Sequence, residues 1–283
     1  MSDWLRCWLS SPWQGPSIRR RILLTTRTFE WESSRQLSIV GLLLAFILPS
    51  AFAFFAFRVV LRLWVENDGA PIIAYLVVAA VALLVLTVLG VVLLRSEARQ
   101  LGISFWARAC FKKLSRREWL LYLGILLVGG LATVSLSGVL PAFMDALGLS
   151  VPDYYPFFLD PTIDAANTDM AVLSPGFDLR GAWGVLPLMA VVLTFNILAE
   201  ELYFRAWVLP KLSKYGNWGW IANGTLFALY HTFQLWFLPI LLPASLLIAF
   251  VVYRSKSVLP AFAFHFVGNF LLTMAGVAVL VAS

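Results

Sequence analysis

The stretch PIIAYLVVAAVALLVLTVLGVVLL, Pro71–Leu94, contains no charged residue. It is long enough to cross a lipid bilayer as one helix, because about 20 apolar residues span the hydrocarbon core. Similar runs recur along the chain, which is 61% hydrophobic and only 13% charged. Soluble domains are about 45–50% apolar and about 25% charged. The composition therefore predicts an all-α fold, a polytopic transmembrane helix bundle that forms one compact body.

The apolar runs predict about seven membrane spans, and six or eight spans remain as alternatives. One long run without Asp, Glu, Lys or Arg is long enough for two spans. Pro239 and Pro243 predict a turn within it, which gives the fifth and sixth spans. The predicted spans are Ser38–Phe57, Pro71–Leu94, Trp119–Pro141, Ala182 to about Phe204, Asn217–Phe237, Ile240–Tyr253 and Val258–Ala282.

The basic residues predict how the bundle is oriented in the membrane. Most Lys and Arg residues lie in segments on one side of the predicted bundle, namely 1–37, 95–118, 201–217 and 254–257. The opposite side carries only Arg58, Arg62 and Arg180. Because basic loops stay in the cytosol, we expect a cytosolic amino terminus and an outer carboxyl terminus. The net charge of +6 follows from this loop distribution, so no nucleic-acid partner is expected.

Ionisable side chains are rare in the last spans, where each costs roughly 2.5–3.5 kcal/mol at a helix centre. The candidates are Glu200, Glu201, Arg205, His231 and His265, and these two histidines are the only ones in the chain. Such expensive positions are the most informative ones for function.

The two adjacent glutamates need not do the same thing. Glu201 and Arg205 are four residues apart, so they can pair along one helix face. Glu200 is rotated by about 100° from its neighbour and is free to face a different partner.

Two further pairs share a helix face at the same spacing: Phe227 with His231, and His265 with Asn269. Three helices can thus present a carboxylate, two imidazoles and a carboxamide to one cavity. These groups suit the hydrolysis of an amide bond. A desolvated carboxylate can act as general base on a water molecule, which an imidazole orients. A carboxamide and a second imidazole can stabilise the oxyanion.

Each feature also has a purely structural interpretation. Glu201 with Arg205 can be an ion pair near the membrane surface, and His231 can be a hydrogen-bonded histidine between helices. His265 with Asn269 can be a polar contact that holds two helices together. Buried Glu and His residues can also form a proton relay in a transporter, although no repeated halves are visible. The combination of all these groups on three late spans favours catalysis.

Three short motifs carry a family resemblance. EELYFR (200–205) fits EExxxR, FALYH (227–231) fits FxxxH, and HFVGN (265–269) fits HxxxN. In their order and separation they resemble the CPBP family, the CAAX protease and bacteriocin-processing (Abi) intramembrane proteases. The resemblance extends over about residues 118–283 and implies a glutamic-type intramembrane protease core there. Residues 38–117 would then be two accessory transmembrane helices with a basic cytosolic loop, and residues 1–37 a cytosolic amino-terminal arm.

The resemblance implies roles for four catalytic residues. Glu200 would be the base that activates water, and His231 would hold or activate the same water. His265 and Asn269 would form the oxyanion site. This glutamate mechanism needs no metal or other cofactor. One carboxylate and two imidazoles can nevertheless bind zinc, in which case the ligands would be Glu200, His231 and His265.

Glu201 and Arg205 would support the site, and Phe227 would pack beside it or line a pocket. The resemblance implies a membrane-associated protein or peptide substrate, such as a lipidated or carboxyl-terminal tail, processed in a bacterial or archaeal cell membrane. A catalytically silent scaffold or immunity protein that binds a peptide in the same cavity is the alternative. The substrate and the oligomeric state stay open.

The predicted helix ends raise a difficulty of depth. They place Glu200 near the cytosolic end of its span and His265 about two turns in from the same side. His231 would lie about four turns in, which is a poor match for one shared cavity unless its helix begins later or the cavity is deep.

Overall fold

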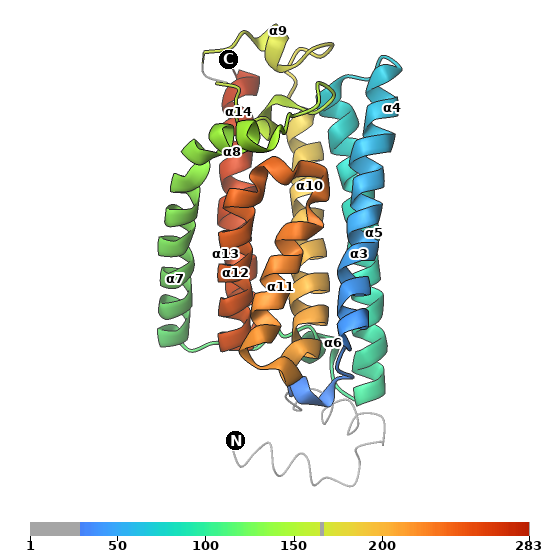
Figure 1. The fold of residues 1–283 in the computed structure, drawn as a ribbon, viewed down its shortest axis with the longest axis vertical. Coiled ribbons are helices and arrows are strands. Elements are labelled where there is room, and N and C mark those ends of the chain that lie inside the picture. The colour runs from blue at the N-terminus through green and yellow to red at the C-terminus, as the bar shows by residue number, and fades with distance from the viewer. Residues whose placement is uncertain (1–28, 165–166, 283) are drawn as a thin grey trace, which may run out of the picture.

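The computed structural model describes residues 29–164 and 167–282, so most of the predicted amino-terminal arm (1–28) lies outside it. The described chain is a bundle of long helices without a strand (Figure 1). Its described residues include six helices that are long and apolar enough to cross a membrane. The predicted all-α polytopic bundle is therefore confirmed, and the protein is an integral membrane protein. The six spans are Ile39–Glu66, Pro71–Leu101, Arg116–Leu147, Val185–Tyr215, Thr232–Ser255 and Leu259–Ala282.

Several spans combine more than one type of helix. The first half of the chain contains α3 (Ile39–Phe55), a π-helical turn (Ala56–Val60), α4 (Leu61–Glu66), α5 (Pro71–Leu101), α6 (Phe105–Arg108), α7 (Arg116–Val134), a 3-10 segment (Ser135–Val139) and α8 (Leu140–Leu147). After α9 (Met170–Leu173), the second half contains α10 (Val185–Ala199), the π-helix Glu200–Val208, the 3-10 segment Leu209–Tyr215, α11 (Asn217–Tyr230), the 3-10 segment Thr232–Phe237, α12 (Leu238–Ser255), α13 (Leu259–His265), a π-helical segment (Phe266–Leu271) and α14 (Leu272–Ala282). Short 3-10 turns also occur at Trp31–Ser33 and Phe157–Leu159.

Local sequence signals set several helix ends. The Ser38 side chain caps α3 by accepting a hydrogen bond from Gly41 N at 3.1 Å. Pro71 begins α5, where its missing N–H is not needed, and Gly102 ends that helix in the left-handed conformation. Ser115 and Glu118 form a capping box at the start of α7. These signals place the ends of the long helices at the two ends of the bundle.

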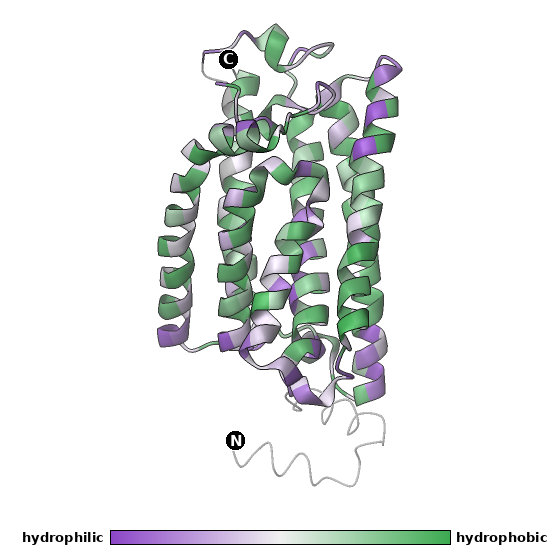
Figure 2. Cartoon of the chain, viewed as in Figure 1, coloured by the Kyte–Doolittle hydropathy of each residue, from purple (hydrophilic) through white to green (hydrophobic). Residues whose placement is uncertain are grey.

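Hydropathy follows the arrangement expected for a membrane protein. In Figure 2 the long helices are mostly green through their middle, and purple residues gather at the two ends of the bundle. Large apolar side chains such as Ile39, Val88 and Leu120 are exposed on the outer faces of α3, α5 and α7. Because a contiguous apolar surface of this kind is unfavourable in water, it is the surface that contacts lipid.

The predicted fifth span, Asn217–Phe237, is not a continuous helix. α11 ends at Tyr230 after 14 residues, which is about 21 Å and shorter than the hydrocarbon core of about 30 Å. The backbone at Gln234 is non-helical, and the following helix starts at Leu238. The predicted turn at Pro239 and Pro243 is therefore wrong, because α12 begins just before these prolines and continues through them.

The predicted end of the fourth span at about Phe204 is also wrong. The helix continues through the π-helix and the 3-10 segment to Tyr215, giving a helix of 31 residues with Glu200 in its middle. Arg205 and Lys211, which the sequence places in a cytosolic segment, are both buried, at 0% and 3% exposure. Inside the bundle Arg205 donates to Asn223 and Lys211 pairs with Glu97, and these contacts offset part of the cost of burying the two charges.

The first two spans share one hydrophobic core with the later helices. α5 packs against α10 and the π-helix, where a Cβ atom on Gly90 would lie 3.4 Å from the backbone nitrogen of Tyr203. The phenyl ring of Phe46 on α3 stacks on Phe204 with 5.1 Å between ring centroids. The π-helix that carries Glu200 and Glu201 is thus enclosed by α3, α5, α10 and α11.

α11 and α12 pack closely against each other at Gly224. A Cβ atom at this position would lie 2.8 Å from Leu246 Cα and 3.0 Å from its nitrogen. We expect Gly224→Ala to destabilise the bundle by about 1–3 kcal/mol, because these backbone atoms cannot move without separating the helices. Gly124 on α7 is the matched control, since a Cβ atom added there would have nothing within 4 Å. Thermal unfolding of both alanine variants in detergent tests this prediction. An equal change in melting temperature in the two variants would contradict a close contact at Gly224.

Candidate active site

The two adjacent glutamates are buried and face different histidines. Glu200 and Glu201 begin the π-helix Glu200–Val208 and are 6% and 0% exposed. Glu200 Oε1 lies 3.7 Å from Nε2 of His231, whereas Glu201 Oε1 lies 3.2 Å from Nδ1 of His265. π-Helical segments are rare and occur often at functional sites. The neighbouring carboxylates thus belong to two separate contacts.

The imidazole of His231 is held in one orientation. His231 follows the last residue of α11, and its Nδ1 lies 3.0 Å from the carbonyl oxygen of Phe227. Because a carbonyl oxygen only accepts hydrogen bonds, Nδ1 carries the proton in this contact and Nε2 is directed at Glu200. The ring of Phe227 packs edge-on against the imidazole with 5.1 Å between centroids. Because the fourth span continues to Tyr215, Glu200 lies as deep in the bundle as His231, which removes the predicted mismatch of depth.

A chain of amides links Glu200 to a third segment. Asn196 Nδ2 donates a hydrogen bond to Glu200 Oε1 at 2.8 Å, and Asn269 Nδ2 donates to Asn196 Oδ1 at 3.0 Å. Asn269 lies in the π-helical segment Phe266–Leu271. Three segments therefore bring a carboxylate, an imidazole and a carboxamide together.

Sequence reasoning missed Asn196. The available signal was its position four residues before Glu200, which places the two side chains on one helix face. A neutral amide in an apolar span costs less than a charge, and only ionisable groups had been considered in that span.

Arg205 does not pair with Glu201 as the spacing predicts. In the described part of the chain no ion pair within 4.0 Å joins Glu201 to Arg205, and Glu201 contacts His265 instead. Arg205 Nη1 instead donates to Asn223 Oδ1 at 2.8 Å, and its guanidinium lies 4.2 Å from the ring centroid of Phe227. The prediction fails because it assumes an α-helix, whereas the π-helix has different faces and directs Arg205 toward α11.

Asn223 was also missed, and it connects α11 to the π-helix. It is 0% exposed, accepts from Arg205 and donates from Nδ2 to the carbonyl oxygen of Phe204 at 3.0 Å. We expect Asn223→Leu to lower the free energy of unfolding by about 2–3 kcal/mol, since it leaves a buried guanidinium and a buried carbonyl without this partner. Asn67→Leu is the control, because Asn67 makes only an exposed contact to Leu63 O. Thermal unfolding checks the difference, and a stable Asn223→Leu protein would contradict the structural role.

The residues considered for zinc are not arranged as a set of ligands. Among residues 29–164 and 167–282, no group of three His, Cys, Asp or Glu side chains is placed to hold a metal ion. Of Glu200, His231 and His265, the first two lie near each other, and His265 contacts Glu201 instead.

The fold and the site together define a class of protein. It is a polytopic helical membrane protein with a buried cluster of carboxylate, imidazole and carboxamide groups within its helices. All seven residues singled out in the sequence lie in this region: Glu200, Glu201, Arg205, Phe227, His231, His265 and Asn269.

Comparison with known proteins finds a family domain in part of the chain. Residues 182–271 match the family model described as Type II CAAX prenyl endopeptidase Rce1-like. This part of the chain is therefore a domain of the CAAX protease (CPBP) family, as the three motifs predict, and it contains every candidate site residue. The family is one of peptide hydrolases, which implies protein or peptide substrates. No curated protein and no solved structure matches the chain significantly.

Proposed function

We propose that this protein is an intramembrane endopeptidase in which Glu200 activates a water molecule for attack on a peptide bond. The observation that carries the proposal is the 3.7 Å separation between Glu200 Oε1 and Nε2 of His231. This distance is too long for a direct hydrogen bond, but one water molecule can contact both groups at once. Both side chains are buried, which strengthens electrostatic interactions with that water.

The proposed reaction moves one proton through Glu200. The carboxylate takes a proton from water as the water oxygen attacks the carbonyl carbon of the substrate. A tetrahedral intermediate forms, and the carbonyl oxygen becomes an oxyanion. The proton on Glu200 then passes to the peptide nitrogen as the carbon–nitrogen bond breaks. His231 supports these steps from Nε2, because its Nδ1 is engaged by the carbonyl oxygen of Phe227.

Asn269 and His265 are the proposed oxyanion donors. The Asn269 amide has two N–H groups, of which one is donated to Asn196, so the other remains for an oxyanion. The contact with Glu201 holds the His265 ring in place. Asn196 is a positioning residue that orients the Glu200 carboxylate. Removing one oxyanion donor typically lowers the rate about 100- to 1,000-fold.

The proposed substrates are membrane-associated or lipidated proteins and peptides. Support comes from the family domain and from the position of Glu200 in the middle of a membrane span. We place the protease core at residues 118–283, with accessory helices in 38–117. We also place the end of the bundle near Trp31 on the cytosolic side of a bacterial or archaeal membrane, because basic residues concentrate there.

Comparative proteomics of cells that make wild-type or Glu200→Gln protein tests this function. We expect at least one membrane-associated protein or peptide to remain uncut in cells with the variant. Cells with Glu66→Gln, a change in an exposed ion pair, should process it normally. Identical cleavage products in both strains would contradict proteolysis. If peptide binding persisted in that case, the silent scaffold would be the better description.

A further inference from the structure

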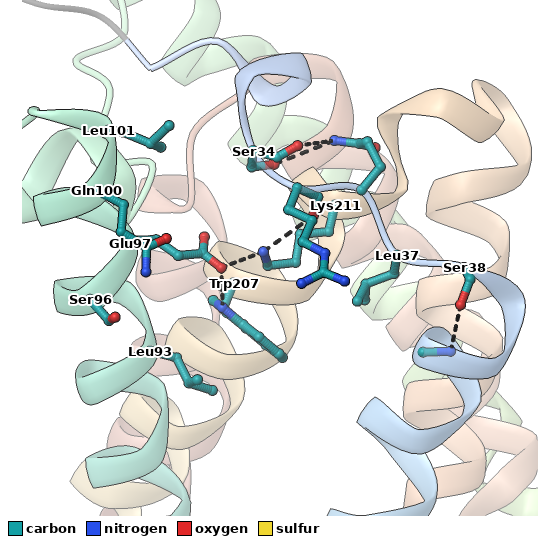
Figure 3. A pocket seen from close by; sticks show the side chains of 13 residues that line it. Ser34, Leu37, Ser38, Leu93, Ser96, Glu97, Gln100, Leu101, Trp207 and Lys211 are labelled. Atoms are coloured by element: carbon teal, nitrogen blue, oxygen red, sulfur yellow. Dashed lines mark hydrogen bonds and ion pairs between the residues drawn. The ribbon is translucent and has the colours of Figure 1, made fainter.

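A polar pocket lies at one end of the bundle, away from Glu200. It has a volume of about 510 Å³ and opens between the start of α3, the end of α5 and the 3-10 segment Leu209–Tyr215 (Figure 3). This is the end at which basic residues concentrate. The residues that matter for its chemistry are Arg35, Leu93, Ser96, Glu97, Gln100 and Lys211.

One wall of the pocket is a fixed ionic network with surplus positive charge. Glu97 pairs with Lys211 and accepts a hydrogen bond from Trp207 Nε1 at 3.0 Å (Figure 3). It also pairs with Arg108 at 2.6 Å. The Lys211 and Arg108 side chains are 4% and 0% exposed. Two cations share one carboxylate, so the network remains positive after Glu97 is neutralised.

Free hydrogen-bond donors face the same pocket. The Arg35 guanidinium is exposed and has no hydrogen-bond or ion-pair partner within the described part of the chain. Ser96 and Gln100 are exposed and also lack side-chain partners among those residues. A guanidinium with nearby hydroxyl and carboxamide donors suits an anion with several oxygens, and phosphate has this chemistry.

The rim of the pocket is apolar and continues onto the lipid-facing surface. Leu37, Leu93 and Leu101 line it, and the exposed side chains of Ile39 and Val92 follow on α3 and α5. An occupant can therefore place a charged group in the pocket and an alkyl chain along the helices. Residues 1–28 contain more Arg than Asp and Glu, so this segment has a net positive charge and is a poor match for a positively charged pocket.

We propose that this pocket binds the phosphate headgroup of an anionic membrane phospholipid. The phosphate contacts Arg35, Ser96 and Gln100, the positive network of Lys211 and Arg108 attracts it, and the acyl chains lie against α3 and α5. This site is independent of peptide hydrolysis at Glu200.

Native mass spectrometry of the full-length protein in detergent tests the proposal. We expect the delipidated protein to bind one short-chain phosphatidylglycerol about tenfold more tightly than phosphatidylcholine. Arg35→Gln should weaken phosphatidylglycerol binding about fivefold to tenfold, since a basic residue near a membrane surface contributes about that factor. Arg254→Gln is the matched control and should change phosphatidylglycerol binding less than about twofold, because Arg254 is exposed in the last turn of α12 and does not line the pocket.

Three results would overturn the proposal. Equal binding of the two lipids would show that the pocket does not select an anion. An equal loss of affinity for phosphatidylglycerol in Arg35→Gln and Arg254→Gln would show that the lipid is attracted by surface charge in general and not by a defined site. Inorganic phosphate that displaces phosphatidylglycerol at equal concentration would make free phosphate the ligand and contradict the lipid assignment.

Discussion

Replacing Glu200 with Gln is expected to lower the rate of peptide cleavage about a thousandfold, within the 100- to 10,000-fold range typical of general base catalysis. Gln keeps the size of the side chain and an oxygen that can accept the hydrogen bond from Asn196. It cannot take a proton from water, so the chemical step fails while the fold survives. The measurement is kcat/KM for a cleavable peptide in detergent or nanodiscs, together with the apparent melting temperature of each protein.

Glu66→Gln is the matched control for this prediction, because Glu66 is exposed and distant from the buried cluster. Its activity should equal that of the wild type. Full activity in Glu200→Gln would eliminate Glu200 as the base. Activity that a chelator removes and zinc restores would instead indicate metal catalysis, which the described arrangement of His and acidic residues does not favour.

Replacing Arg108 with Ala is expected to destabilise the protein by about 3–5 kcal/mol, the usual cost of removing one partner of a buried ion pair. Arg108 is 0% exposed and contacts Glu97 through two nitrogens, at 2.8 and 2.6 Å. It also donates to the carbonyl oxygens of Ala206 and Trp207 at 2.7 and 3.4 Å. These carbonyls belong to the π-helix, so the substitution removes partners from the helix that carries Glu200.

We expect the apparent melting temperature of Arg108→Ala to fall by about 10 °C, since about 2–4 °C accompany each kcal/mol in a protein of this size. Arg62→Ala breaks an exposed ion pair with Glu66 and should leave the melting temperature close to that of the wild type. If Arg108→Ala cannot be purified, Arg108→Lys provides the comparison, because it keeps the charge but loses the two-pronged contact. A wild-type melting temperature in Arg108→Ala, or in Arg108→Lys if only that variant can be purified, would contradict a stabilising role for the two-nitrogen contact with Glu97.

The membrane spans could be predicted because hydropathy is a local property. Pro71–Leu94 identifies a span without reference to any other residue, and the structure extends it to Leu101. The break after Tyr230 could not be predicted in this way. Its residues are as apolar as those of a span, and the turn forms where the chain packs against α12 and α3.

Only part of the candidate site could be predicted from the sequence. Buried charges are conspicuous in an apolar sequence, so Glu200, Glu201, His231 and His265 stood out. The neutral Asn196 was not conspicuous, yet it orients the Glu200 carboxylate in the structure. Asn269 could be predicted because it belongs to the HxxxN motif, whereas Asn196 lies outside the three motifs.

The motif spacing and hydropathy are sufficient to establish an integral membrane bundle with a CAAX protease family domain, because both signals lie within short segments of the chain. Tertiary structure was needed to decide which partner each charged side chain has. Glu201 contacts His265 and Arg205 contacts Asn223, although Glu201 and Arg205 stand four residues apart. A buried charged side chain contacts the polar group that a neighbouring helix places within hydrogen-bonding distance. Which helices are neighbours depends on packing between residues far apart in sequence.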